Sequence, residues 1–182
     1  MNIIIASDLY RIEGLKGFSG LLKGLKNPGF RYIYIFRILS TCIKYSPKWL
    51  LFSLLKRRYT YKYGFQIPTK TKIGKGLYIG HFGTLIINKN AIIGENCNLS
   101  PNVIIGETNR GEKRGSPKIG DKVWIGSGAV IVGSISIGNN VLIAPNSFVN
   151  EDIPNNSIVI GNPATIIQNN NATKDYINFV NP

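Results

Sequence analysis

The sequence contains a single histidine, His81, and this residue is the first candidate for chemistry. Imidazole is the one ordinary side chain that changes charge between pH 5 and 8, so it can take a proton from a hydroxyl group and release it again. His81 lies in a glycine-rich segment, Gly80–Thr84, where it interrupts what otherwise reads as a turn. We predict that His81 is a general base. The alternative is a histidine on a solvent-facing turn.

The two cysteines, Cys42 and Cys97, follow neither a metal-ligand spacing nor a disulfide spacing. This pattern favours a reducing compartment, and we expect no metal site. Cys97 falls on a core position of the repeat described next, so a small core residue explains it better than a reactive thiol does.

An internal repeat determines where these residues lie. An aliphatic residue, usually followed by a small one, recurs every six positions. The repeat positions are Ile73, Ile79, Leu85, Ile93, Leu99, Ile105, Ile119, Ile125, Ile131, Ile137, Ile143 and Val149. A second apolar set follows four residues later in eight of these units: Leu77, Cys97, Val103, Val123, Ala129, Ile135, Val141 and Ile153.

A six-residue period predicts a mainly β fold, because three hexads form one coil of three short strands around a triangular core. We expect about four coils across residues 67–154, followed by a closing segment. Residues 88–90 and 106–118 interrupt the register. The longer interruption reads as a loop thrown out from a corner, and it could equally be a mobile solvated loop.

The first 62 residues have a different composition and hold 12 of the 22 basic side chains but only two acidic ones. They read as two or three helices. Ser7 and Asp8 are a candidate N-cap for a helix that ends near residues 27–29, a second helix spans about 30–45, and a third runs from Pro47 to about Tyr61. Arg37 and Lys44 would share a solvated basic face. Residues 168–182 form a polar C-terminal tail that should be poorly ordered unless it packs on a neighbour.

The composition limits the functional classes. Hydrophobic residues make up 43% and charged residues 17%, which excludes disorder over most of the chain, while the net charge of +13 predicts an anionic partner. The basic aromatic N-terminal region could be a solvated cap or could contact an anionic membrane surface. No nucleic-acid motif accompanies the charge. Without a signal peptide or a long apolar run, we expect a cytoplasmic protein, with peripheral contact at the inner membrane face as the alternative.

The hexads, the segment Gly76–Thr84, the run Gly120–Ala129 and the ending Gly161–Ala164 resemble the hexapeptide-repeat acetyltransferases. The nearest branch is related to serine acetyltransferase and includes capsule and exopolysaccharide O-acetyltransferases. The resemblance covers residues 63–167. It implies a left-handed parallel β-helix that assembles as a homotrimer, with acetyl-CoA bound in the groove between neighbouring subunits. Two such trimers could pair.

The resemblance also implies roles for individual residues. His81 takes the place of the catalytic histidine, and Phe82 and Thr84 beside it would contact the substrate. Ser127, Gly128 and Ala129 would bind the pantetheine arm of acetyl-CoA, with Lys118 near its phosphates. Asn109 and Arg110 in the long loop are candidate acceptor contacts.

Three departures bear on the acceptor. Serine acetyltransferases have a second histidine where this chain has Ser116, an orienting aspartate where it has Gln66, and a longer helical N-terminal region. We therefore expect an O-acetyltransferase that acts on a sugar hydroxyl of a bacterial capsular or surface polysaccharide or its precursor. The alternatives are serine O-acetylation, amino-sugar N-acetylation, and a non-catalytic β-helix scaffold.

Overall fold

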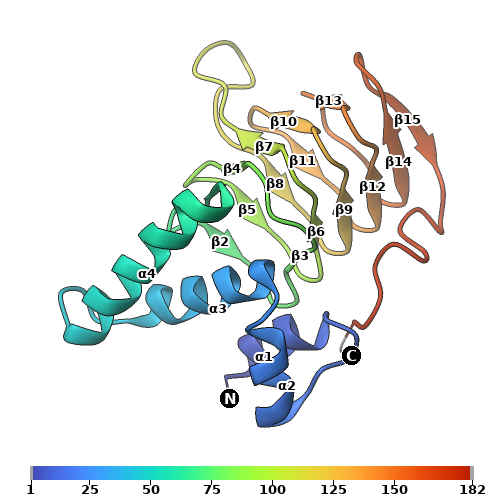
Figure 1. Cartoon of the computed structure of the whole chain (residues 1–182). Coiled ribbons are helices and arrows are strands. Elements are labelled where there is room, and N and C mark those ends of the chain that lie inside the picture. The colour runs from blue at the N-terminus through green and yellow to red at the C-terminus, as the bar shows by residue number, and fades with distance from the viewer. Residues whose placement is uncertain (1, 181–182) are drawn as a thin grey trace.

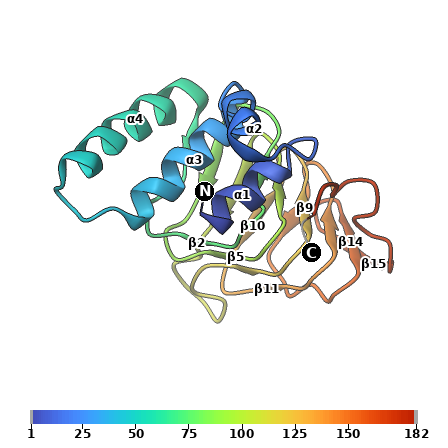
Figure 2. The same ribbon diagram turned by 90° about the horizontal axis from the view of Figure 1, so that it is seen from below.

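The computed structural model describes residues 2–180, in which four helices lie at one end of a parallel β-helix (Figure 1). The helices are α1 (Ile3–Tyr10), α2 (Gly17–Gly24), α3 (Pro28–Thr41) and α4 (Pro47–Tyr63). The C-terminal segment returns to the end of α1, where the Phe179 ring lies edge-on against Tyr10, while α3 and α4 project to one side of the β-helix (Figure 2).

Short strands build the β-helix as three sheets. Sheet 1 contains β1 (Phe65–Gln66), β4 (Leu85–Ile87), β7 (Val103–Gly106), β10 (Val130–Val132) and β13 (Phe148–Val149). Sheet 2 contains β2 (Lys72–Ile73), β5 (Ile92–Ile93), β8 (Lys118–Ile119) and β11 (Ser136–Ile137). Sheet 3 contains β3 (Tyr78–Ile79), β6 (Asn98–Leu99), β9 (Val123–Ile125), β12 (Val141–Ile143), β14 (Ser157–Ile160) and the antiparallel β15 (Thr165–Gln168).

The strands form five coils. The segment expected to close the structure supplies the last one, because Ile153 bridges to Ile137 in sheet 2 and β14 pairs with β12 in sheet 3. The hexad interpretation is confirmed in the core. All twelve repeat residues are buried except Ile73, which is partly buried, and the second apolar set is buried throughout. Cys97 is fully buried, as its core position predicts.

The prediction for the first helix is wrong. Asp8 is not an N-cap but a buried residue inside α1, and Asn2 caps that helix by accepting a hydrogen bond from the N–H of Ile4. The segment then breaks into two helices, because Glu13 and Gly14, which lie between them, adopt positive φ angles of 49° and 73°. α4 begins at Pro47, as predicted, whereas α3 begins at Pro28, before the expected start near residue 30, and ends at Thr41 rather than near residue 45. Asn27 and Ser46 provide side-chain caps.

The expected solvated face of α3 is also wrong for Arg37. Its guanidinium is buried and forms an ion pair with Asp8, with 2.8 Å between Nε and Oδ2. It also donates to the carbonyl oxygens of Ile73 and Gly74, at 2.7 and 2.6 Å, and Asp8 accepts from the N–H of Leu77. The pair therefore holds α1 and α3 against the first coil. Lys44 is exposed but lies beyond the end of α3, so it does not share a helical face with Arg37.

The C-terminal tail packs on its own chain rather than standing free. The Tyr176 ring lies edge-on against Trp124 with 4.9 Å between centroids, and the Tyr176 carbonyl accepts from the Asn98 amide. Buried Arg11, the C-cap residue of α1, donates to the Asn178 carbonyl at 2.9 Å. The polar composition of the tail did not predict these contacts, because they are made largely by its backbone.

Much of α4 is exposed. Leu50, Leu51 and Leu54 face solvent on this helix, and Ile43 and Tyr45 are exposed just before it. No helix within residues 2–180 has the length and apolar character needed to cross a membrane.

Candidate active site

His81 lies on one edge of the β-helix, where each strand of sheet 3 turns into sheet 1. The strand register aligns Ile79, Leu99, Ile125, Ile143 and Val159 in consecutive coils. The residue two positions after each of these therefore occupies the same corner. We call this column the His81 edge, and its members are His81, Pro101, Ser127, Pro145 and Gly161.

His81 is exposed at the first coil of this edge, and no residue in the described part of the chain forms a hydrogen bond with its imidazole. The backbone around it is held in place. The N–H of Gly83 donates to the Tyr63 carbonyl at 3.0 Å, and a side chain at Gly83 would meet Pro101 of the next coil. The histidine is thus presented on a fixed turn with both ring nitrogens free to meet a substrate.

An aromatic cluster adjoins this turn, and it was not predicted from the sequence. Phe82 is 66% exposed, and its ring lies 6.4 Å from that of Tyr63 at the end of α4. Tyr63 stacks on Tyr59, and its hydroxyl accepts from the Arg31 guanidinium at 2.9 Å. The excess of aromatic residues in the helical region was the available signal, but only the fold places Tyr63 next to the His81 turn.

Ser127 is the best-placed backbone donor further along the His81 edge. It is exposed, and no described residue accepts from its backbone N–H. The corner residues above and below it are Pro101 and Pro145, which have no N–H to offer. An extended ligand lying on this edge would therefore find the Ser127 N–H between two positions that cannot donate.

The two residues after Ser127 serve the fold. Gly128 has φ 74°, its N–H donates to the Pro101 carbonyl, and any side chain there would meet Asn146. Ala129 is fully buried, and its N–H and carbonyl are used by Gly126 and Ile104. The structure leaves no atom of Ala129 free for a cofactor.

The remaining predicted residues lie away from His81 within one chain. Thr84 is exposed beside the His81 turn, but Lys118 lies on sheet 2 between Ile92 and Ser136. Asn109 and Arg110 are exposed in the insertion that leaves the chain where sheet 1 turns into sheet 2. We call this corner the loop edge.

The insertion is a small hairpin in which Thr108 and Gly115 exchange backbone hydrogen bonds of 3.0 and 2.9 Å. Lys113 fixes its direction, because the Lys113 carbonyl accepts from Ser134 and its ammonium group donates to Asn150. The hairpin therefore leans along the loop edge toward the later coils.

The two departures from the serine acetyltransferase pattern have defined positions. Gln66 is exposed in β1 and pairs with Ile86. Ser116 lies on the loop edge, where its hydroxyl donates to the Asn88 side chain at 3.1 Å. Residues 2–180 contain no group of three or more His, Cys, Asp or Glu side chains that could hold a metal ion.

Comparisons with known proteins agree with this geometry. Residues 116–151 match the family model described as bacterial transferase hexapeptide (six repeats). The crystal structure of serine acetyltransferase from Neisseria gonorrhoeae in complex with serine is 31% identical, with a TM-score of 0.71, and the match covers 90% of this chain and 67% of that one. The chain belongs to the hexapeptide-repeat acetyltransferase family. The predicted resemblance is confirmed, and so is the left-handed β-helix.

Two further relatives bear on function. Serine acetyltransferase 4 of Arabidopsis thaliana is 32% identical over 150 residues, which are 82% of this chain and 41% of that protein. The serine acetyltransferase of Brucella abortus, solved in complex with coenzyme A, is 27% identical with a TM-score of 0.74, over 91% of this chain and 67% of that one. The chain spans less than half the length of the curated relatives with which it aligns.

Proposed function

We propose that this protein transfers the acetyl group of acetyl-CoA to a hydroxyl group of an acceptor, with His81 as the general base. The observation that carries the proposal is the His81 edge of a hexapeptide-repeat acetyltransferase, where an exposed histidine without a hydrogen-bond partner shares a column with an unused backbone donor. A non-catalytic scaffold has no need of either group.

The chemistry is direct acyl transfer. One imidazole nitrogen of His81 takes the proton of the acceptor hydroxyl while that oxygen attacks the thioester carbonyl. The carbon–sulfur bond then breaks, and the departing coenzyme A sulfur receives the proton from the imidazolium. The thioester already carries an activated acyl group, so the protein needs no nucleophile of its own. A positioned base of this kind contributes about 10²–10⁴-fold to the rate.

The His81 edge suits the pantetheine arm of acetyl-CoA. Neighbouring coils are separated by about 4.8 Å, so Ser127 lies two steps, or roughly 10 Å, from His81 along the column. We propose that the thioester lies at His81 and the arm runs past the Ser127 N–H. The coenzyme A complex of the Brucella abortus relative supports the cofactor assignment. Lys118 is on a different face and could meet the phosphates only from a neighbouring subunit.

We propose that the site is completed in a homotrimer. A single chain leaves the His81 edge open and places Asn109, Arg110 and Ser116 on the loop edge. If each subunit lays its loop edge against the His81 edge of the next, the two edges form a closed cleft, with Ser116 nearer the histidine and Asn109 and Arg110 further along it toward the later coils. A dimer of trimers is a further arrangement that the exposed helices would permit.

L-Serine is the acceptor with the stronger support. The relatives reported above are serine acetyltransferases, and one of them was solved with serine bound. A sugar hydroxyl of a surface glycan, which we expected from the sequence, is less well supported and is kept as the second candidate because Ser116 and Gln66 replace two polar residues of the serine enzymes. Amino-sugar N-acetylation has no observation of its own in its favour.

We propose a cytoplasmic protein whose helical region contacts an anionic membrane face. Exposed Leu50, Leu51 and Leu54 lie on the same helix as Arg57 and Arg58. Apolar side chains flanked by cations favour such a surface.

The test is the release of coenzyme A thiol with L-serine and, separately, with a panel of bacterial capsule glycans. Turnover with serine alone would establish serine O-acetylation and remove the glycan candidate. Turnover with a glycan alone would reverse the order of the two acceptors. If acetyl-CoA neither binds nor turns over with any acceptor, the proposed activity is wrong.

A further inference from the structure

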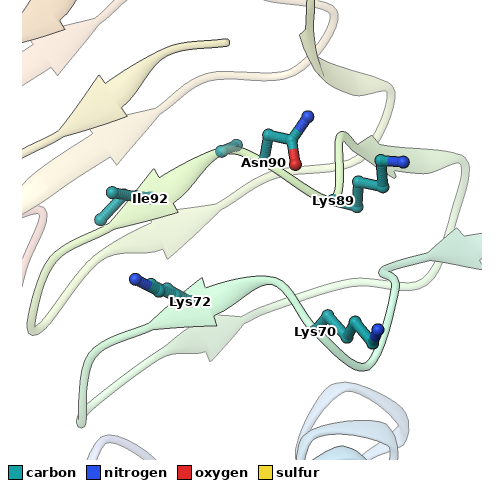
Figure 3. Close-up of a pocket in the computed structure, with 6 residues that line it drawn as sticks. Lys70, Lys72, Lys89, Asn90 and Ile92 are labelled. Carbon is teal, nitrogen blue, oxygen red and sulfur yellow. The ribbon is translucent and has the colours of Figure 1, made fainter.

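Three lysines surround a hollow of about 450 Å³ on sheet 2, away from the His81 edge. We call it the lysine hollow, and its lining residues are Lys70, Lys72, Lys89, Asn90, Ala91 and Ile92. Lys72 and Ile92 lie side by side on β2 and β5, while Lys70 and Lys89 lie in the turns that precede these strands (Figure 3). The fold thus brings together cations from two successive coils.

These cations have no partner of opposite charge. Within residues 2–180 the ion pairs are Asp8–Arg37 and Lys75–Glu95, and neither involves the hollow. Lys72 neighbours Ile92 rather than another lysine in the strand register, so the three lysines are spread around the hollow. Acidic residues do occur at this edge in the last coil, where Asp152 accepts from the N–H of Ser136. In the strand register the same position is held by Lys72 in the first coil, Ile92 in the second and Lys118 in the third.

The rest of the lining indicates what the anion is attached to. Ile92 is 37% exposed and presents an apolar surface, and Asn90 offers an exposed amide that can both donate and accept. The volume lies in the range of small-molecule sites. An acidic sugar has carboxylates, hydroxyl groups and the apolar face of a pyranose ring. In the hollow these would meet the lysines, the Asn90 amide and the Ile92 side chain, respectively. Lysine ammonium groups act as point charges, which suits single carboxylates spaced along a chain.

We propose that the lysine hollow binds an acidic oligosaccharide through the carboxylates of its uronic acid residues. Lys70, Lys89 and Asn90 lie in turns from sheet 1 to sheet 2, so the hollow is away from His81 within one chain and borders the loop edge that the proposed homotrimer brings to a neighbouring His81 edge. The proposed binding does not depend on which acceptor His81 serves. The test therefore measures binding alone.

The probe is a tetramer of galacturonic acid, titrated calorimetrically into the full-length protein at low and physiological salt. Its methyl ester has the same rings without the charges and serves as the matched ligand control. The site variant is Lys72→Gln with Lys89→Gln. The protein control is Lys23→Gln with Lys48→Gln, which removes two exposed lysines of the helical region and so changes the net charge equally.

We expect the acid to bind and its ester not to bind. Each lysine should contribute about fivefold in affinity, as a close exposed charge pair does, so the site variant should bind at least tenfold more weakly while the control changes less than twofold. Unchanged melting curves would show that both variants fold. Equal weakening in both variants would mean diffuse attraction and would overturn the proposal. So would failure of the acid to bind, or equally strong binding of inorganic pyrophosphate at the same ionic strength.

Discussion

Breaking the Asp8–Arg37 pair should loosen the helices from the β-helix. Asp8→Ala leaves the Arg37 guanidinium, 7% exposed, without its counterion and removes the acceptor of the Leu77 N–H. Removing one partner of a buried pair costs about 3–5 kcal/mol, because the other charge stays in a low-dielectric site. We expect a loss of that size in the free energy of unfolding.

The assay is urea unfolding at one fixed protein concentration, since assembly also adds to stability. Lys75→Ala is the matched control, because the Lys75–Glu95 pair is 3.7 Å long and its side chains are 32% and 47% exposed. That variant should cost less than about 1 kcal/mol. A loss of the same small size for Asp8→Ala would refute the assigned docking role.

The double variant Asp8→Leu with Arg37→Met tests the reason for the loss. Burial raises the pKa of the Asp8 carboxyl, although Arg37 and the Leu77 N–H act in the opposite direction. The charged pair thus carries a large desolvation cost, and an apolar pair of similar size should recover part of the stability lost in Asp8→Ala. Losses that simply add, with no coupling between the two sites, would contradict this explanation.

Three other outcomes follow from single contacts. Burial raises the pKa of the Cys97 thiol to about 12. At pH 8 a disulfide reagent should therefore titrate Cys42 alone in the native protein and both thiols in denaturant. Two reactive thiols in the native protein would contradict the buried position of Cys97. Ser127→Pro should raise the KM for acetyl-CoA with little change in melting temperature, whereas Ser127→Ala, which keeps the N–H, should not; equal effects would assign the role to the hydroxyl. Gly29→Ala should destabilise the protein by about 1–3 kcal/mol in urea unfolding, because the new methyl group overlaps the Ile79 carbonyl; an unchanged midpoint would mean that α3 shifts freely.

The β-helix could be predicted because its signal is local and repeated. Each hexad carries its own aliphatic residue and small corner residue, so a residue assigned wrongly at one corner is corrected by the regular pattern at the others. The position of His81 on the same column as Ser127 follows from counting hexads. The final coil was harder to see, because Ile153 takes the sheet 2 position four residues after Val149 instead of six.

The helical region could not be predicted in the same way. Nothing near Asp8 or Arg37 in sequence shows that they meet across 29 residues, so a capping role and a solvated face were reasonable expectations for charged residues. The tail shows the same limit, because its contact with Trp124 comes from a distant coil. Tyr63 is brought beside Phe82 only by the packing of α4 on the first coil.

The role of His81 as general base is most directly tested by the rate of coenzyme A release in His81→Ala, measured with the acceptor that the wild-type protein uses. We predict a fall of about 10²–10⁴-fold in kcat, with acetyl-CoA binding and the melting temperature unchanged. A variant that keeps wild-type turnover would show that another group takes the acceptor proton, and the account of the His81 edge would be wrong.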